Sequence, residues 1–218
     1  MTAWLWAFMI GGGFLAGGVM FSKLIPKLLT NADICEASDD KNPGAYNAFA
    51  HCGKKIGSLC LILDVLKGLI PVLLCCLLLN PENMLFSLVM LAPVLGHAVG
   101  LFNRFQGGKC IAVSFGVLFG ILPVTRFALL LLAVLYIFFS TVVKIHPNSK
   151  RSILVYLLFG VGSYVFLKFH GLLSLAVGCA LIAVTVIVKH LKRSAPVREA
   201  DAEPPVPTEE IVSSEEAG

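Results

Sequence analysis

The chain has 218 residues, of which 57% are hydrophobic and only 14% are charged, whereas about a quarter of the residues in an average soluble domain are charged. A soluble protein of this size has too much surface for its volume to hide that many apolar side chains. The composition therefore excludes an ordinary soluble enzyme and makes the lipid bilayer the solvent of most of the chain.

The formal net charge of +4 is unevenly distributed. All 17 basic residues lie in positions 1–198, whereas positions 199–218 carry seven acidic residues and no basic one. We therefore expect a basic membrane domain over residues 1–193 and an acidic, proline-rich tail over 194–218 that is disordered. The seven cysteines include no CxxC pair, which favours reduced thiols and argues against a zinc site.

Seven apolar segments follow one another along the chain, and several have the roughly 20 residues that a spanning helix needs. They cover about 3–28, 55–79, 84–102, 110–123, 125–144, 151–168 and 172–190. The first has no basic region before it, which favours a spanning helix over a cleaved signal peptide. The fourth is short, and Pro123 separates it from the fifth. The sequence predicts an all-α integral membrane protein with seven transmembrane helices.

Basic residues indicate the orientation, because lysine and arginine accumulate on the cytoplasmic side of a membrane. With the N-terminus outside, 14 of the 17 basic residues lie in or beside the inner connections. The outer connections then hold Arg126 and Lys168, and Lys67 lies inside the second apolar segment. We therefore predict an outer N-terminus and a cytoplasmic C-terminus.

Two inner connections carry residues suited to binding an anion. Asn42, Gly44 and Asn47 are turn residues that expose backbone amides, although a plain solvated loop has the same composition. Gly107, Gly108 and Lys109 precede an apolar helix whose N-terminus attracts negative charge. The alternative is a glycine turn with a lysine anchored at the head groups.

The second apolar segment contains an acidic and a basic residue, Asp64 and Lys67. Their i,i+3 spacing places both on one helical face, where the charges neutralise each other. Ionisable residues at membrane depth are candidates for function, but a structural ion pair is the interpretation that we favour here.

Seven short motifs follow one another along about residues 10–195. They are Asn42-x-Gly44-Ala45-x-Asn47, Gly53-Lys54-Lys55-x-Gly57, Leu63-Asp64-Val65-Leu66-Lys67-Gly68, Leu95-Gly96-His97, Phe105-x-Gly107-Gly108-Lys109, Ser152-Ile153 and Lys189-His190. In order and spacing they resemble the bacterial acyl-phosphate:glycerol-3-phosphate acyltransferases (PlsY type). The family has seven transmembrane helices, as predicted above.

The resemblance implies transfer of a fatty acyl group from acyl phosphate to the 1-hydroxyl of glycerol 3-phosphate. The products are lysophosphatidic acid and phosphate, in the first step of phospholipid biosynthesis. It also implies a multi-pass protein of the bacterial plasma membrane with a cytoplasmic active site, and no requirement for a metal, a nucleotide or acyl-CoA.

The resemblance also assigns site residues. The implied catalytic residues are His97 and Lys109. The implied substrate-binding residues are Asp40, Asn42, Gly44, Asn47, Gly107, Gly108, Ser152, His190 and Arg193. The proton acceptor for the attacking hydroxyl is either the phosphate of the acyl phosphate itself or His97.

The chain departs from the family pattern at four positions, which makes it a divergent member. Asp40 replaces a serine, Ala50 an arginine, Cys110 a glycine and Arg193 an asparagine. Arg193, Lys54 or Lys55 is a candidate to compensate for the lost arginine. Two alternative functions follow: a related acyltransferase with another phosphorylated acceptor, or a non-catalytic membrane binding or transport protein. The chain shows no internal repeat, which argues against a transporter.

Overall fold

The computed structural model describes residues 2–38 and 40–194, except for the side chains of Thr2, Arg193 and Ser194. Its secondary structure consists of helices joined by connections, with no strand among the described residues. The helices are α1 (Thr2–Gly18), α2 (Phe21–Thr30), α3 (Ile34–Ala37), α4 (Ala45–Leu78), α5 (Leu85–Val99), the short 3-10 helix η1 (Leu101–Asn103), α6 (Ile111–Gly120), α7 (Phe127–Thr141), α8 (Asn148–Phe169) and α9 (Leu173–Ser194). The predicted acidic tail lies outside the described residues from position 195 onward.

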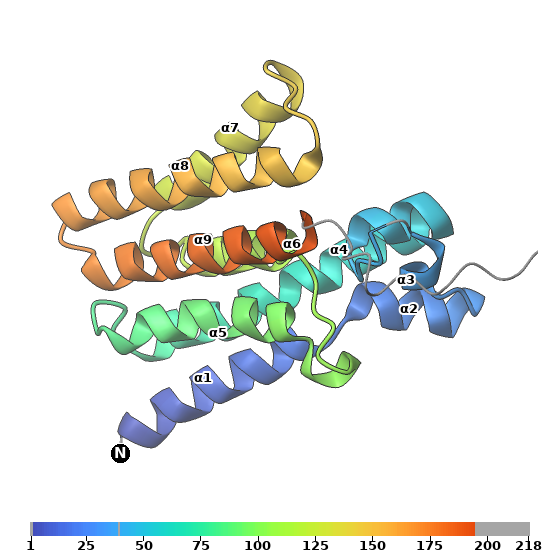
Figure 1. Ribbon diagram of the computed structural model, residues 1–218. Coiled ribbons are helices and arrows are strands. Elements are labelled where there is room, and N and C mark those ends of the chain that lie inside the picture. The colour runs from blue at the N-terminus through green and yellow to red at the C-terminus, as the bar shows by residue number, and fades with distance from the viewer. Residues whose placement is uncertain (1, 39, 195–218) are drawn as a thin grey trace, which may run out of the picture.

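The long helices pack side by side as a bundle (Figure 1). Helix α9 lies between α8 and α5, and α5 packs against α1. Helix α4 packs against α6, α1 and α2, whereas α7 packs mainly against α8 at the edge of the bundle. The core of the bundle is apolar and includes the buried side chains of Phe86, Met90, Tyr156, Phe159 and Ile182.

Glycines let two helix pairs approach closely, as is common where helices pack in a membrane. A Cβ atom on Gly17 of α1 would collide with the carbonyl of Pro93, and one on Gly96 of α5 would collide with that of Phe14. Helices α4 and α6 meet in the same way through Gly68 and Gly116. Gly96 directly precedes His97, so this close packing also fixes the position of the histidine backbone.

The first predicted apolar segment is broken into two helices, α1 and α2, which are bent by 44° relative to each other. The predicted pair of Asp64 and Lys67 forms, with 2.7 Å between Nζ and Oδ1. Lys67 Nζ also donates to the carbonyl of Val19 at the break, at 2.6 Å. Ser22 donates to Asp64 Oδ2, also at 2.6 Å. A buried ionic network in α4 therefore holds the bend.

The second apolar segment begins earlier than predicted, because α4 starts at Ala45 and contains non-helical backbone at Gly53 (φ 79°, ψ 176°). A glycine adopts this positive φ at little cost. The turns of α4 before Gly53 therefore change direction at that residue, and they carry Asn47 to the same end of the bundle as α2 and α3 (Figure 1).

Four helices are long and apolar enough to cross a membrane, and the bent pair of α1 and α2 makes a fifth candidate span among the described residues. The remaining two, α6 with 10 residues and α7 with 15, are shorter. At 1.5 Å per residue, α6 extends only about 15 Å, or about half of a ~30 Å hydrocarbon core. The chain is therefore a multi-pass membrane protein.

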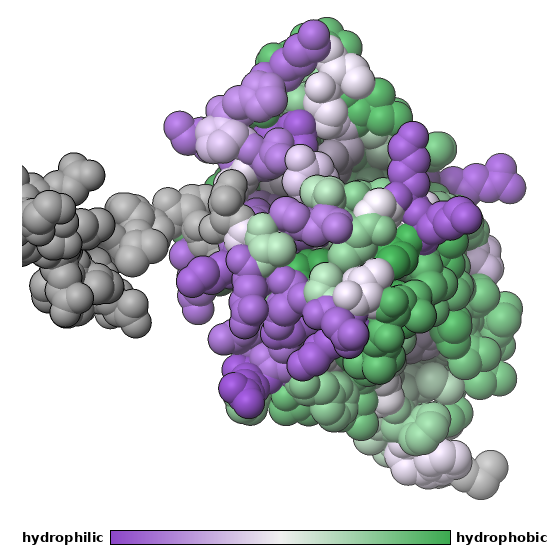
Figure 2. Space-filling view, turned by 90° about the vertical axis from the view of Figure 1, so that its right-hand side faces the viewer, coloured by the Kyte–Doolittle hydropathy of each residue, from purple (hydrophilic) through white to green (hydrophobic). Residues whose placement is uncertain are grey.

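One end of the bundle is strongly polar. Figure 2 looks onto this end, where hydrophilic side chains gather beside an apolar flank. Four exposed lysines from α2 to the first turns of α4 contribute to it, namely Lys27, Lys41, Lys54 and Lys55. The helix flanks expose leucine, valine and phenylalanine side chains, as expected for a surface that faces lipid.

Candidate active site

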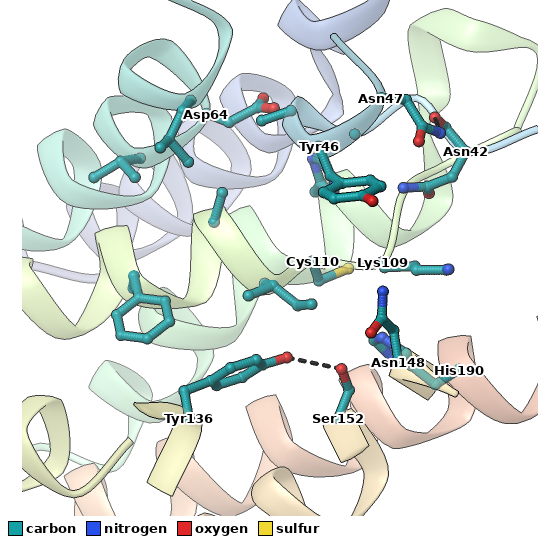
Figure 3. A pocket seen from close by; sticks show the side chains of 18 of the residues that line it. Asn42, Tyr46, Asn47, Asp64, Lys109, Cys110, Tyr136, Asn148, Ser152 and His190 are labelled. Atoms are coloured by element: carbon teal, nitrogen blue, oxygen red, sulfur yellow. Dashed lines mark hydrogen bonds between the residues drawn. The ribbon is translucent and has the colours of Figure 1, made fainter. Parts of the chain in front are cut away.

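A cavity of about 530 Å³ lies between the start of α4, the start of α6 and the start of α8 (Figure 3). Its lining combines polar residues from the connections with apolar residues from the helices. The lining residues are Asp40, Asn42, Gly44, Ala45, Tyr46, Asn47, Leu61, Asp64, Val65, His97, Lys109, Cys110, Ile111, Ala112, Phe115, Phe119, Tyr136, Asn148, Arg151, Ser152 and His190.

The first wall is the connection before α4, and its own hydrogen bonds shape it. Asn47 Nδ2 donates to Asp40 Oδ1 at 2.8 Å and to the carbonyl of Asn42 at 2.9 Å. The backbone N–H of Asn42 donates to the same Asp40 oxygen at 3.1 Å. Asn42 and Asn47 are buried, and Gly44 precedes the first turn of α4. This wall, residues 40–47, is thus compact and closes around the Asp40 carboxylate; it is called the Asp40 loop below.

Lys109 reaches this wall from the start of α6. Its Nζ lies 2.8 Å from Asp40 Oδ2 in a direct ion pair. Burial raises the pKa of the Asp40 carboxyl, but the hydrogen bonds from Lys109 and Asn47 and the charge of Lys109 together outweigh it, so the pKa lies below its ordinary value of 3.8. Asp40 is therefore ionised at neutral pH and holds the lysine across the cavity.

The turn before Lys109 depends on close backbone contacts. The N–H of Gly108 donates to the carbonyl of His97 at 3.0 Å. A Cβ atom on Gly107 would strike the carbonyls of His97 and Ala98, and one on Gly108 would strike the ring of His97. Neither glycine is among the lining residues. They lie behind the cavity, where they hold Lys109 and His97 close to each other.

Two buried histidines line the cavity from the neighbouring helices α5 and α9. His97, at the end of α5, is 4% exposed, and His190, near the end of α9, is 1% exposed. The Nδ1 of His190 lies 2.8 Å from the carbonyl of Val186. Because a carbonyl can only accept, Nδ1 carries the proton in this contact, and the ring orientation is fixed by its own helix.

The wall opposite the Asp40 loop comes from α7 and α8. The hydroxyl groups of Tyr136 and Ser152 are hydrogen-bonded at 2.7 Å. Figure 3 shows Ser152 and Asn148 across the cavity from Asn42 and Asn47. Ser152 is buried at 2% exposure, so its hydroxyl belongs to the cavity interior.

Apolar residues of α4 and α6 continue the lining away from these polar walls. They include Leu61, Val65, Ile111, Phe115 and Phe119. Leu61 is 39% exposed and Phe119 is 38% exposed on the flank of the bundle. The polar part of the cavity is thus joined to an apolar arm that extends toward the lipid-facing surface.

The structure brings together most of the residues expected from the sequence. Asp40, Asn42, Gly44, Asn47, His97, Lys109, Ser152 and His190 all line the cavity. Lys54 and Lys55, considered as compensating cations, are exposed and do not line it. The side chain of Arg193 lies outside the described residues.

Sequence reasoning did not select four polar residues of the lining: Tyr46, Tyr136, Asn148 and Arg151. Asn148 and Arg151 lie in the first turn of α8, directly before Ser152. Their place beside a predicted site residue at a helix start is a signal that could have identified them. Tyr136 has no such signal, because only the packing of α7 beside α8 brings it to Ser152.

The fold and the cavity define a class of protein: a multi-pass membrane protein whose interfacial site suits an amphiphilic substrate with an anionic head group. Amide groups and a lysine face the polar part, and the apolar arm suits a hydrocarbon chain. The described residues contain no group of His, Cys, Asp and Glu side chains that could hold a metal ion.

Comparisons with known proteins identify the family. A family model described as glycerol-3-phosphate acyltransferase matches residues 7–198. A glycerol-3-phosphate acyltransferase from Hydrogenobaculum sp. is 32% identical over 178 residues, which cover 82% of this chain and 86% of the relative. Glycerol-3-phosphate acyltransferase 2 from Thermotoga maritima is 40% identical over 114 residues, covering 52% and 57%.

Solved structures agree. The crystal structure of PlsY (YgiH), an integral membrane glycerol 3-phosphate acyltransferase, in its glycerol 3-phosphate form superposes with a TM-score of 0.72 at 27% identity. The match covers 86% of this chain and 88% of that one. The lysophosphatidic acid form gives a TM-score of 0.70. The chain belongs to the glycerol-3-phosphate acyltransferase family and is an integral membrane enzyme of phospholipid biosynthesis.

Proposed function

We propose that the cavity transfers a fatty acyl group from acyl phosphate to the 1-hydroxyl of glycerol 3-phosphate and releases lysophosphatidic acid and phosphate. The observation that carries this proposal is the union of an anion-binding polar part, built from Lys109, Asn42 and Asn47, with an apolar arm in one cavity. Both substrates carry a phosphate, and the donor also carries a hydrocarbon chain.

Stabilisation of the leaving phosphate is the main catalytic task. Negative charge grows on the phosphate as the bond between the acyl carbon and the phosphate oxygen breaks. Fixed hydrogen-bond donors and cations aimed at that charge give the largest rate effect. Lys109 and the side-chain amides of the Asp40 loop supply such donors. Asp40 already binds Lys109, so an incoming phosphate has to share the ammonium group with the carboxylate or displace it.

The attacking hydroxyl must lose a proton during the reaction. The phosphate of the donor can accept it, and His97 on the cavity wall can either accept it or hydrogen-bond a substrate. His190 and Ser152 complete the polar lining around the reacting groups.

We place the site on the cytoplasmic side of a bacterial plasma membrane, with seven crossings, an outer N-terminus and a cytoplasmic tail. Two features support this topology. The lysines of the first connection lie at the polar end of the bundle, and the residues lining the polar part of the cavity come from that same end. Each of the seven apolar segments contains a helix, with α6 and α7 as two short crossings.

The proposal is tested with purified protein in detergent, supplied with palmitoyl phosphate and glycerol 3-phosphate in the presence of EDTA. We expect lysophosphatidic acid and phosphate in equal amounts, and no product when palmitoyl-CoA replaces palmitoyl phosphate. Product from palmitoyl-CoA alone, or activity abolished by EDTA, would contradict the proposed donor or the proposed independence from metals.

A further inference from the structure

Arg151 is a basic residue of the cavity wall, and the mechanism proposed above assigns it no role. It lies in the first turn of α8, next to Ser152, and lines the cavity. Its Nε is buried and has no hydrogen-bond partner among the described residues. None of the ion pairs found in the described part of the chain includes it.

The charges of the lining single out this arginine. Asp40 and Asp64 are the acidic residues of the lining, and Lys109 and Arg151 are its lysine and arginine. Asp40 is paired with Lys109, and Asp64 with Lys67 of its own helix. Both carboxylates are thus paired with lysines, and none of the ion pairs in the described part of the chain joins either of them to Arg151.

A cation in a partly buried position is costly unless an anion meets it. Guanidinium groups are particularly suited to phosphate, because their planar fork can make two parallel hydrogen bonds to its oxygens. The environment supports an anion here. Helix α8 has no side-chain cap on its first turn, so its N-terminal N–H groups add positive potential beside Arg151.

We propose that Arg151 binds the phosphate of one of the two phosphorylated substrates, on the wall opposite the Asp40 loop. The proposal rests on the proposed function, since a reaction between acyl phosphate and glycerol 3-phosphate places two phosphates in one cavity. Lys109, shared with Asp40, serves one of them, and Arg151 serves the other. Asn148 and Ser152 face the cavity beside it (Figure 3) and supply neutral hydrogen-bonding groups.

The test compares Arg151→Gln, Arg151→Lys and Lys150→Gln. Lys150 is the matched control, because it is the adjacent basic residue on the same helix but is exposed and does not line the cavity. KM is measured separately for palmitoyl phosphate and for glycerol 3-phosphate. The substrate whose KM rises is the one that Arg151 binds.

For Arg151→Gln we expect the KM of one substrate to rise about ten- to a hundredfold, as for loss of a charge-assisted hydrogen bond. Arg151→Lys keeps the charge but loses the fork, so its KM should lie between those of the wild type and Arg151→Gln. Lys150→Gln should stay within about twofold. Unchanged KM values for both substrates in folded Arg151→Gln would overturn the proposal.

Binding of inorganic phosphate separates this proposal from the proposed reaction. Calorimetric titration of the detergent-solubilised protein with inorganic phosphate should give weaker binding for Arg151→Gln than for the wild type, whether or not lysophosphatidic acid is formed. If the wild type forms no lysophosphatidic acid but Arg151→Gln still binds phosphate more weakly than the wild type, the proposed reaction is refuted and the role of Arg151 is not. Equal phosphate affinity in both proteins would refute the role of Arg151.

Discussion

The Asp40 carboxylate occupies three donors that a substrate phosphate could also use. Lys109 Nζ, Asn47 Nδ2 and the N–H of Asn42 all point at it, at 2.8, 2.8 and 3.1 Å. The acid therefore acts as an internal anion that keeps the loop ordered around Lys109. Its identity was visible in the sequence as a departure from the family, but its hydrogen-bond partners depend on how the loop folds back toward α6.

The ion pair of Asp40 should make stability depend on pH in a defined direction. Because the pKa of Asp40 in the folded protein lies below its ordinary value of 3.8, its contribution is fully present above about pH 4. The contribution is lost as pH falls through the folded-state pKa. Thermal unfolding of the wild type and Asp40→Asn should therefore differ at pH 7, and the difference should shrink as the pH falls below 3.8. A difference that persists unchanged at low pH would contradict the ion pair.

Gly108 controls the position of His97 by its lack of a side chain. A Cβ atom there would strike the imidazole ring, so Gly108→Ala should displace His97 from the cavity wall and reduce the rate at least about tenfold, within the range of a lost general base or hydrogen bond. Gly12→Ala is the control, since a Cβ there meets nothing within 4 Å. Equal rates of lysophosphatidic acid formation in the two variants would argue against this packing.

At the scale of elements, α4 organises the half of the site that lies beside it. Its start carries Asn47, and its middle carries the network that holds the bend between α1 and α2. The i,i+3 spacing of Asp64 and Lys67 was enough to predict their ion pair. The contacts to Ser22 and to the Val19 carbonyl were not predictable from that spacing, because they exist only where α1 ends and α2 begins.

Breaking this network should destabilise the bundle. Lys67→Met leaves the buried Asp64 without its ion-pair partner, which typically costs about 3–5 kcal/mol. The double variant Asp64→Asn/Lys67→Met removes the stranded charge and should recover most of that loss. The free energy of unfolding in detergent is measured for the single and the double variant. A double variant no more stable than Lys67→Met would show that the pair is not coupled.

At the scale of the whole molecule, hydropathy predicted the helical membrane architecture but not the lengths of the helices. The fourth segment is the exception, because it was expected to be short and α6 has only 10 residues. Residues of the predicted second to seventh segments meet in one cavity. Motif residues could be assigned to it by resemblance, and Arg151 could have been inferred from its place beside Ser152, whereas Tyr136 enters it only through the packing of α7 beside α8.

The proposed topology places the two ends of the bundle on opposite sides of the membrane. In intact cells, a membrane-impermeant maleimide should label Glu82→Cys, in the exposed connection between α4 and α5. Lys55→Cys, at the polar end, should react only after permeabilisation. Labelling of the unsubstituted chain gives the background signal from its native cysteines. The reverse labelling pattern would contradict the proposed orientation and indicate the opposite one.

The central claim is that this cavity carries out acyl transfer, and Lys109 is the residue that tests it most directly. The measurement is phosphate release from palmitoyl phosphate, dependent on glycerol 3-phosphate, by the purified wild type, Lys109→Ala and Lys41→Ala. Lys41 lies in the Asp40 loop but is exposed and does not line the cavity. Loss of a charge-assisted phosphate contact of about 1.5–3 kcal/mol should slow Lys109→Ala about ten- to a hundredfold and leave Lys41→Ala near the wild-type rate. An unchanged rate for folded Lys109→Ala would contradict the assignment of the cavity as the active site.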